Sequence, residues 1–351
     1  MNKNISKIIN RDSKCLSDLN KSSIGLVVTS PPYPMIAMWD DVFSKQDNRI
    51  SQALKADNGS LSFELMHQVL ERVWSEIERV LIPGGIACIN IGDATRSIGS
   101  NFQLFDNRSR IVKSFIENGM QLLPNLIWRK PTNSPNKFMG SGMLSPGAYV
   151  TLEHEHILIF RKGTKREFKT DVEKINRSKS AYFWEERNLW FSDVWFDIKG
   201  VGQKVDDIDL RNRSGAFPFE IAYRLIQMFS VKNDTVLDPF IGTGTTAIAA
   251  IASQRNCIGY EIDPNFLSVI TKRLLKSVDF SNKRIEDRIN THLRFVENRD
   301  KSNSKIKYEN YVHGFPVVTK QETKAEFCFV SSIESLSENT ISANYRLITN
   351  C

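Results

Sequence analysis

The chain has 351 residues, of which 41% are hydrophobic and 25% are charged. This composition is ordinary for a globular protein and excludes a chain that is disordered throughout. The formal net charge of +7 is compatible with a polyanionic partner, because lysine and arginine side chains that neutralise phosphates release counterions. The five cysteines are widely spaced and form no CxxC pair, so neither a zinc knuckle nor a disulfide framework is indicated.

The N-terminal segment MNKNISKIINRDSKC has no apolar core of the kind that a signal peptide needs. Elsewhere no stretch approaches the roughly 20 apolar residues that cross a membrane. We therefore expect a cytoplasmic protein that makes no membrane contact.

Short apolar runs alternate with helical stretches along the chain, and this order predicts an α/β fold with a largely parallel sheet covered by helices. The clearest helix spans 61–81; Ser60 or Ser62 can cap it, and the Pro-Gly-Gly at 83–85 should end it. Further helices are expected at 217–229 and 245–253. The expected strands are 24–28, 86–91, 122–128, 156–160, 235–237 and 257–260.

The segment VLDPFIGTGTT at 236–246 reads as a strand, a tight glycine turn and a helix start. Glycine lets the backbone approach a ligand closely, and the helix N-terminus presents free amides to it. Glu261 follows a later strand, where a carboxylate can accept hydrogen bonds from ribose hydroxyls. The pattern predicts a nucleoside-bearing cofactor. Because the loop also nearly satisfies the dinucleotide motif GxGxxA, an NAD-dependent oxidoreductase stays open at this point.

A second motif, TSPPY at 29–33, follows the buried strand 24–28. The prolines fix φ and remove backbone donors, so the carbonyls of Ser30 and Pro31 can be held outward as acceptors. Oxygens that accept the hydrogens of an exocyclic amine would localise its lone pair for attack on a sulfonium methyl group. Tyr33 offers a flat surface to a base that has been rotated out of a duplex.

Together these two motifs resemble the amino-methyltransferase branch of DNA methyltransferases, over roughly residues 5–275. TSPPY is similar to the catalytic motif of that family and DPFIGTGTT to its cofactor loop, and their order is that of the permuted β group. The resemblance implies S-adenosylmethionine as the cofactor. It also implies a Rossmann-like, mixed seven-stranded sheet with helices on both faces and one antiparallel strand, for which 156–160 is the candidate.

The resemblance also assigns roles to individual residues. The expected catalytic residues are Ser30, Pro31, Pro32 and Tyr33. The expected cofactor-binding residues are Asp12, Phe217, Pro218, Asp238, Pro239, Phe240, Gly242, Gly244, Thr245, Thr246 and Glu261. Two alternatives remain open: Asp12 as an ordinary loop acid and Phe217 as a helix-packing residue. Asp93, which follows strand 86–91, can reach the base or accept a proton, or else cap the next turn.

Two further features point to DNA. Trp128 is similar to a residue that lines the flipped-base pocket in the family, unless it is a core aromatic. The basic run 161–180 precedes an aromatic cluster and is interpreted as a phosphate-binding segment, with a solvated charged face as the alternative. The residues expected to contact DNA there are Lys162, Lys165, Arg166 and Lys169. His154 and His156 lack further ligands nearby, and no metal site is expected.

We predict four segments: a catalytic half at 1–160, a basic and aromatic target-recognition insertion at 161–205, a cofactor-binding half at 206–275, and a basic extension at 276–351 that is a further candidate for DNA contact. Ser30 favours the N4 amine of cytosine as the target, because serine at this position is typical of the cytosine enzymes of the family and Asp or Asn of the adenine-N6 enzymes.

The expected protein is thus a restriction–modification methyltransferase that flips a cytosine out of double-stranded DNA. A cognate restriction endonuclease acting on the same site, and a monomer or a homodimer, are compatible with this interpretation. The alternatives are an adenine-N6 methyltransferase, an NAD-dependent oxidoreductase, and a DNA-binding protein without catalysis.

Overall fold

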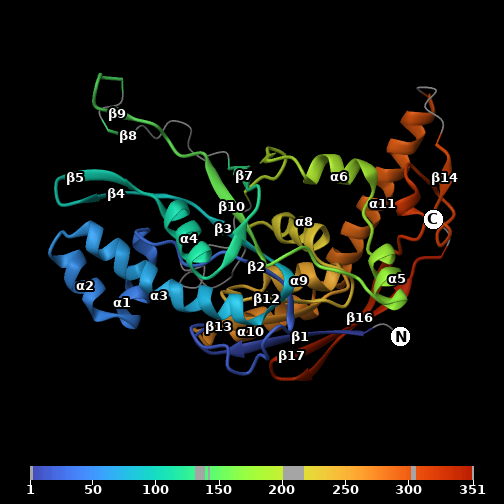
Figure 1. Ribbon diagram of the computed structural model, residues 1–351, viewed down its shortest axis with the longest axis horizontal. Coiled ribbons are helices and arrows are strands. Elements are labelled where there is room, and N and C mark those ends of the chain that lie inside the picture. Colours follow the sequence, from blue (N-terminus) through green and yellow to red (C-terminus); the bar gives the residue numbers. More distant parts are fainter. Residues whose placement is uncertain (1–2, 131–138, 141–142, 201–216, 302–305, 350–351) are drawn as a thin grey trace.

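A single sheet of eleven strands forms the centre of the computed structural model, which describes residues 3–130, 139–140, 143–200, 217–301 and 306–349. Helices cover the sheet on both sides (Figure 1). The strand order is β11-β7-β10-β3-β2-β12-β13-β1-β17-β16, and β6 also pairs with β10. This arrangement confirms the expected α/β fold with a largely parallel centre.

Five parallel strands make up that centre, and their carboxyl ends meet at one edge. They are β3 (Leu81–Ile91), β2 (Ile24–Thr29), β12 (Thr235–Asp238), β13 (Asn256–Glu261) and β1 (Lys3–Asn10). Each pairs in parallel with its neighbour. In open α/β sheets ligands bind outside the carboxyl ends of the strands, so this edge is where the site is sought.

Strand β10 (His154–Lys162) runs antiparallel to β3, which confirms the predicted antiparallel strand at 156–160. The expected strand 122–128 is instead two short strands, β6 (Met120–Leu122) and β7 (Leu126–Arg129), which both pair with β10. Pro124 lies in the break and cannot donate a backbone hydrogen bond to the ladder. Strand β11 (Val194–Trp195) adds to β7.

The central strands are apolar throughout because both of their faces are buried. Leu26 and Val28 of β2 pack on one side, with α8 (Phe219–Phe229), α9 (Thr245–Ala252) and α10 (Asn265–Leu275). Val27 packs on the other side, against α3 (Gly59–Val80) and α4 (Asn107–Glu117). The cap of α3 is the Asn58 side chain, which accepts from Leu61 N at 3.1 Å, rather than either predicted serine.

The sheet is wider than the seven strands that the resemblance implied, and two of its eleven strands come from the C-terminal residues. Strand β17 (Thr340–Leu347) pairs with β1 and with β16 (Cys328–Ser337), and α11 (Val278–Lys301) packs beside them. Strand β1 gave no clear sequence signal, because Asn4 and Ser6 are among its buried positions. The Asn4 side-chain amide nitrogen donates to Asn233 Oδ1 at 3.1 Å. Strands β16 and β17 therefore continue the core sheet.

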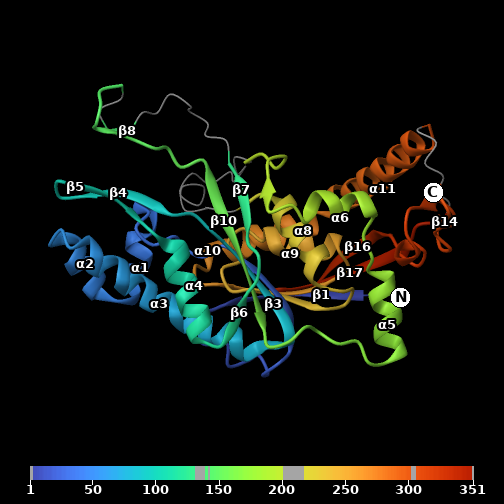
Figure 2. The same ribbon diagram turned by 45° about the horizontal axis from the view of Figure 1, so that its top comes forward.

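Several smaller elements extend the edge at which the central strands end. They are η1 (Ala37–Trp39), α1 (Asp40–Gln46), α2 (Asn48–Lys55), the hairpin β4 (Ala94–Ile98) and β5 (Asn101–Phe105), and the hairpin β8 (Met139–Gly140) and β9 (Ala148–Tyr149). Both hairpins project from the body, and α5 (Asp171–Lys179) lies at the far end of β10 (Figure 2).

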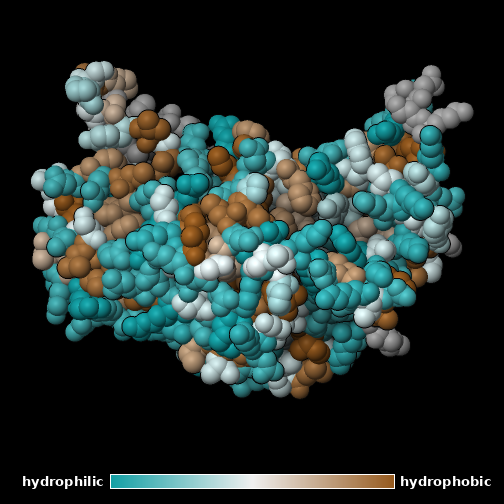
Figure 3. Space-filling view, viewed as in Figure 1, coloured by the Kyte–Doolittle hydropathy of each residue, from teal (hydrophilic) through white to brown (hydrophobic). Residues whose placement is uncertain are grey.

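The remaining elements pack around α11. They are α6 (Trp184–Trp190), β14 (Tyr308–Glu309), β15 (Pro316–Val317) and η2 (Lys320–Glu322). In the space-filling view the outline is hollowed between the projecting hairpins and the end of α11 (Figure 3). Among the described helices, none combines the length and the apolar character needed to cross a membrane.

Candidate active site

The two sequence motifs leave the sheet side by side. Strands β2 and β12 are parallel neighbours, with Val27 opposite Leu237, so the turns that follow them start at the same edge. The Thr29 hydroxyl donates to Asp238 Oδ1 at 2.6 Å and links the two turns directly. The TSPPY turn and the glycine loop therefore leave the same edge of the sheet next to each other.

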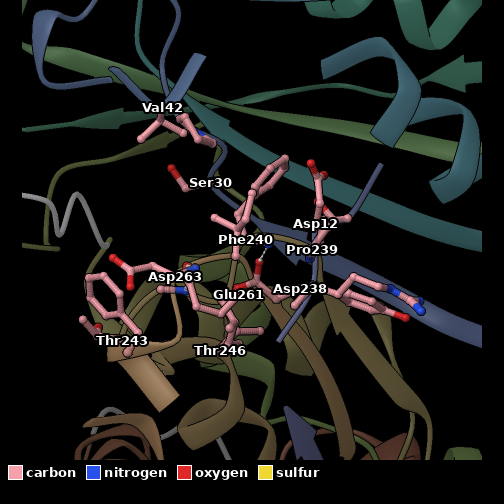
Figure 4. A pocket seen from close by; sticks show the side chains of 18 of the residues that line it. Asp12, Ser30, Val42, Asp238, Pro239, Phe240, Thr243, Thr246, Glu261 and Asp263 are labelled. Atoms are coloured by element: carbon pink, nitrogen blue, oxygen red, sulfur yellow. Dashed lines mark hydrogen bonds between the residues drawn. The ribbon is translucent and has the colours of Figure 1, made fainter. Parts of the chain in front are cut away.

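A pocket opens between these turns (Figure 4). Ser30 and Val42 lie on one side of it, and Glu261 and Asp263 on the other. Of the residues predicted to form the site, those that line this pocket are Asp12, Ser30, Pro32, Phe217, Asp238, Pro239, Phe240, Gly242, Thr245, Thr246 and Glu261. The sequence motifs thus converge on a single cavity.

Asp238 holds the glycine loop in place from beneath the pocket. Its carboxylate accepts hydrogen bonds from the hydroxyls of Thr29 and Thr246, each at 2.6 Å, and from Phe240 N at 3.0 Å. Because the side chain is buried, desolvation raises the pKa of Asp238 to about 6 in spite of these three donors. The carboxylate therefore ties the end of β2, the loop and the first turn of α9 into one unit.

The loop has a backbone that only glycine adopts easily. Gly242 has φ +52° and Gly244 φ +85°, both in the left-handed region. A Cβ atom at position 244 would lie 2.9 Å from Ile270 Cγ2, so close packing on α10 also requires glycine there. This geometry turns the start of α9 toward the pocket, where Thr245 and Thr246 line the wall.

Glu261 lies across the pocket at the end of β13. Its carboxylate accepts from Gly242 N at 3.0 Å and from Asp263 N at 2.9 Å. Burial raises the pKa of Glu261 to about 7, which means that desolvation disfavours its charge at neutral pH. A ligand that donates hydrogen bonds to this carboxylate would offset the cost of its desolvation.

Ser30 and Tyr33 are held in contact with each other. The Ser30 hydroxyl donates to Tyr33 Oη at 3.1 Å, and Asn90 Nδ2 donates to the same oxygen at 2.8 Å. Burial, together with the neighbouring Glu155 carboxylate, raises the pKa of Tyr33 well above its ordinary value. Tyr33 is therefore a neutral phenol at neutral pH.

Comparison with known proteins agrees with this geometry. A family model described as DNA methylase, of the N6/N4 type, matches residues 24–272. The Type II methyltransferase M.MthZI of Methanothermobacter thermautotrophicus is 49% identical over 341 residues, which cover 97% of this chain and 95% of that protein. The chain belongs to the N6/N4 DNA methylase family.

Two further relatives of this DNA methylase are informative. M.MjaI of Methanocaldococcus jannaschii is 48% identical over 279 residues, covering 76% of this chain and 90% of that protein. The structure of TTHA0409 from Thermus thermophilus, complexed with S-adenosyl-L-methionine, is similar with a TM-score of 0.61 and 30% identity, over 78% of this chain and 96% of that one.

Some residues predicted for the methylase site lie beside the pocket rather than in its wall. Pro31, Tyr33, Pro218 and Gly244 are immediate chain neighbours of lining residues. Asp93 accepts a hydrogen bond from Arg108 N at 3.0 Å at the start of α4. The N-cap of α4 is Asp106, so Asp93 makes an additional contact with the first turn of this helix, and its catalytic role stays a prediction.

Trp128 has the position of a core aromatic. Only 1% of its surface is exposed, and its indole nitrogen donates to Ile198 O at 2.9 Å. The side chain therefore has neither an exposed face nor a free donor, and its contact with a flipped base stays a prediction.

The basic run lies at the end of the sheet away from the pocket. Strand β10 is antiparallel to β3, and Arg161 is paired with Ile86 near the beginning of β3. The predicted DNA contact Lys162 is therefore the last residue of β10, at the end remote from Ser30, and Lys165, Arg166 and Lys169 follow it.

Two of these four cations are held by acidic partners on other elements. Lys162 Nζ lies 3.1 Å from Glu78 Oε1, and Arg166 makes a two-pronged pair with Asp234, with Nη1–Oδ2 at 2.6 Å and Nη2–Oδ1 at 3.0 Å. We assign Lys162 and Arg166 to packing at this edge, where they hold α3 and the start of β12. Charge clustering in the sequence does not reveal which end of a strand carries it, and contact of this run with DNA stays a prediction.

Other pocket residues gave no sequence signal. Trp39, Val42 and Gln46 come from η1 and α1, which fold back over the cavity after the TSPPY turn. Gln46 Oε1 and Thr243 Oγ1 are buried and have no hydrogen-bond partner among the residues that the structure describes. Such atoms are acceptors or donors available to a bound molecule. Within the described ranges, no group of three or more His, Cys, Asp or Glu side chains is arranged to hold a metal ion.

The raised pKa of Glu261 predicts a pH dependence of stability. The pKa of Glu261 is about 7 in the folded protein, against an ordinary value of 4.5, so the folded protein holds this proton more tightly than the unfolded chain. The stability that the protonated side chain contributes at low pH is therefore lost as the pH rises through about 7. Glu261→Gln removes this loss. We expect the free energy of unfolding of the variant, relative to that of the parent, to increase by on the order of 2 kcal/mol between pH 5 and pH 8.

Urea unfolding of the ligand-free protein at the two pH values measures this difference. The matched control is Glu117→Gln, whose side chain is 59% exposed on α4. An equal effect of Glu261→Gln at both pH values would contradict the shifted titration.

Proposed function

We propose that this DNA methylase transfers a methyl group from S-adenosylmethionine to the N4 amine of cytosine in duplex DNA, as the modification enzyme of a restriction–modification system. The observation that carries the proposal is the juxtaposition of Ser30, at the end of β2, with the cofactor loop at the end of β12. Serine at this position favours cytosine over adenine, by the resemblance described above.

The pocket fits S-adenosylmethionine. Glu261 can accept from the ribose hydroxyls, and Asp12 from the adenine amine. The pocket wall also supplies apolar surface for a purine ring, from Phe217, Phe240 and Phe266. The unpartnered Thr243 and Gln46 oxygens offer further polar contacts. When bound, the cofactor supplies an electrophilic methyl group on a sulfonium centre.

The TSPPY turn supplies an acceptor for the hydrogens of the target amine. Ser30 directs its hydroxyl proton to Tyr33, so the lone pairs of Ser30 Oγ are free to accept a hydrogen from the target amine. The Pro31 and Pro32 rings remove backbone donors next to this acceptor and fix the turn. Acceptors that are already oriented need no reorganisation when charge develops on the amine nitrogen.

Base flipping accompanies this chemistry, because the N4 amine of a paired cytosine is not accessible inside the duplex. The hairpins β4–β5 and β8–β9 rise from the edge at which the central strands end, and the stacked rings of Phe102 and Tyr149, 4.5 Å apart, hold them together. We place the duplex against these hairpins rather than against the basic run 161–180.

The target base can be identified directly. Long unmethylated duplex DNA of mixed sequence is incubated with the protein and S-adenosylmethionine, digested to nucleosides, and analysed by mass spectrometry. We expect N4-methyldeoxycytidine and no other methylated nucleoside. N6-methyldeoxyadenosine as the product would refute the cytosine assignment while leaving the methylase family untouched.

A cofactor titration on the same preparation tests the oxidoreductase alternative. We expect saturable binding of S-adenosylmethionine and no binding of NAD. Tight NAD binding without S-adenosylmethionine binding would overturn the proposed reaction.

A further inference from the structure

Glu155 has no role in the sequence motifs, yet the structure puts it in contact with the catalytic turn. We propose that Glu155 is a positioning residue for methyl transfer, which holds Tyr33 and, through Tyr33, orients the Ser30 hydroxyl. This inference rests on the proposed function, since it assigns Ser30 and Tyr33 to the amine-binding side of the pocket.

Three donors converge on the Glu155 carboxylate. Tyr33 Oη lies 2.9 Å from Oε2, Asn90 Nδ2 lies 2.6 Å from the same oxygen, and Lys130 Nζ lies 2.9 Å from Oε1. The Glu155 side chain is only 12% exposed, whereas the Lys130 side chain is 50% exposed. Hydrogen bonds thus connect the Glu155 carboxylate through Tyr33 to Ser30, which lines the pocket.

The hydrogen-bond directions in this chain are fixed by chemistry. Asn90 Nδ2 is only a donor, and the ionised Glu155 carboxylate is only an acceptor. Tyr33 has a single hydroxyl proton, which must therefore go to Glu155. Its oxygen is then an acceptor for both Asn90 and Ser30, at 2.8 Å and 3.1 Å.

The consequence for Ser30 is a defined orientation. Because Tyr33 Oη can only accept from it, the Ser30 hydroxyl proton turns away from the pocket and its lone pairs remain for the substrate amine. If Glu155 lost its charge, Tyr33 could donate to Ser30 instead, and the Ser30 oxygen would be occupied. The carboxylate thus determines whether Ser30 accepts or donates.

Close packing around Tyr33 and Glu155 leaves these side chains little room to adopt other positions. A Cβ atom at Gly92 would lie 3.2 Å from Tyr33 Cε2 and 3.3 Å from Glu155 Cγ, so the chain approaches both side chains closely between β3 and β10. Asn90 is 2% exposed, and its Oδ1 has no hydrogen-bond partner among the described residues. The contacts of Asn90 with Tyr33 and Glu155 thus hold a buried amide beside the catalytic turn.

The test is Glu155→Gln, which keeps the shape of the side chain and removes its charge. With tritiated S-adenosylmethionine and long unmethylated duplex DNA, we expect kcat to fall about thirtyfold, while the Kd for S-adenosylmethionine and the melting temperature stay close to those of the parent. The control is Glu153→Gln on the neighbouring chain segment, where Glu153 Oε2 is 3.4 Å from Arg129 and the side chain is 43% exposed. We expect the control to methylate at the parent rate.

A double-mutant cycle separates positioning from general support of the fold. If Glu155 acts through the Tyr33 hydroxyl, Tyr33→Phe combined with Glu155→Gln should be no more than about threefold slower than the slower single variant. A parent-like rate for Glu155→Gln, or losses that multiply, would overturn the proposal.

A second pair of variants tests the same hydrogen-bond network. Should Glu155→Gln not fold, the cycle of Asn90→Ala with Tyr33→Phe reports on the same network, with non-multiplying losses expected and multiplying losses contradicting it. A parent protein that methylates no base would defeat the proposed function itself rather than the role of Glu155.

Discussion

Tyr33→Ala is expected to lower kcat for methyl transfer about a thousandfold while leaving the Kd for S-adenosylmethionine within about twofold of the parent. The variant removes the ring on which a flipped base would stack, an interaction worth roughly 1–3 kcal/mol. It also removes the acceptor of the Ser30 proton, and the loss of a preoriented acceptor costs about 10²–10³ in rate. Tyr33 is not in the wall of the cofactor pocket, so cofactor binding should persist.

Single-turnover methylation with labelled S-adenosylmethionine measures the rate, and isothermal titration measures the affinity. Ser30→Ala should cause a smaller loss, about a hundredfold, because the ring remains. The control is Tyr311→Ala, since that tyrosine is 73% exposed and is not one of the residues that line the pocket. Unimpaired methylation by both Ser30→Ala and Tyr33→Ala would show that the TSPPY turn does not act on the amine, and would favour the alternative of a DNA-binding protein without catalysis.

Residues whose role is fixed by local backbone chemistry could be predicted from the sequence. Gly242 and Gly244 have the left-handed φ angles that a glycine turn predicts, and both prolines of TSPPY follow the strand that the apolar run indicates. The position of the TSPPY turn and the glycine loop at one edge of the sheet is likewise predictable, because the carboxyl ends of parallel strands lie on the same side of a sheet. These features depend on neighbours in the chain, which the sequence displays.

Features that depend on pairing between distant segments could not be predicted. Glu155 contacts Tyr33 across 122 positions of the chain, and nothing in the local sequence distinguishes it from Glu153. Gln46 lines the pocket only because η1 and α1 fold back over it. The direction of β10 likewise decides that Lys162 and Arg166 lie at the end remote from the pocket, although their charge suggested a DNA contact.

Asp238→Ala is expected to weaken binding of S-adenosylmethionine at least a hundredfold. Asp238 is 2% exposed, and its removal would leave the hydroxyls of Thr29 and Thr246 and the amide of Phe240 without their acceptor. Each buried donor left unpaired costs about 1–3 kcal/mol. Since the native loop requires left-handed φ at Gly242 and Gly244, we expect it to relax to other conformations that do not form the pocket.

Asp238→Asn is the matched control because it keeps the shape of the side chain. Its amide oxygen can still accept from Thr29 and Phe240, and its amide nitrogen can donate to the Thr246 hydroxyl, which accepts as readily as it donates. We therefore expect Asp238→Asn to lose only about tenfold in affinity. It should also lose none of the stability at pH 8, since the pKa of about 6 shows that burying this charge is unfavourable there. Equal losses for the two variants would mean that the charge of Asp238, rather than its three hydrogen bonds, holds the cofactor loop.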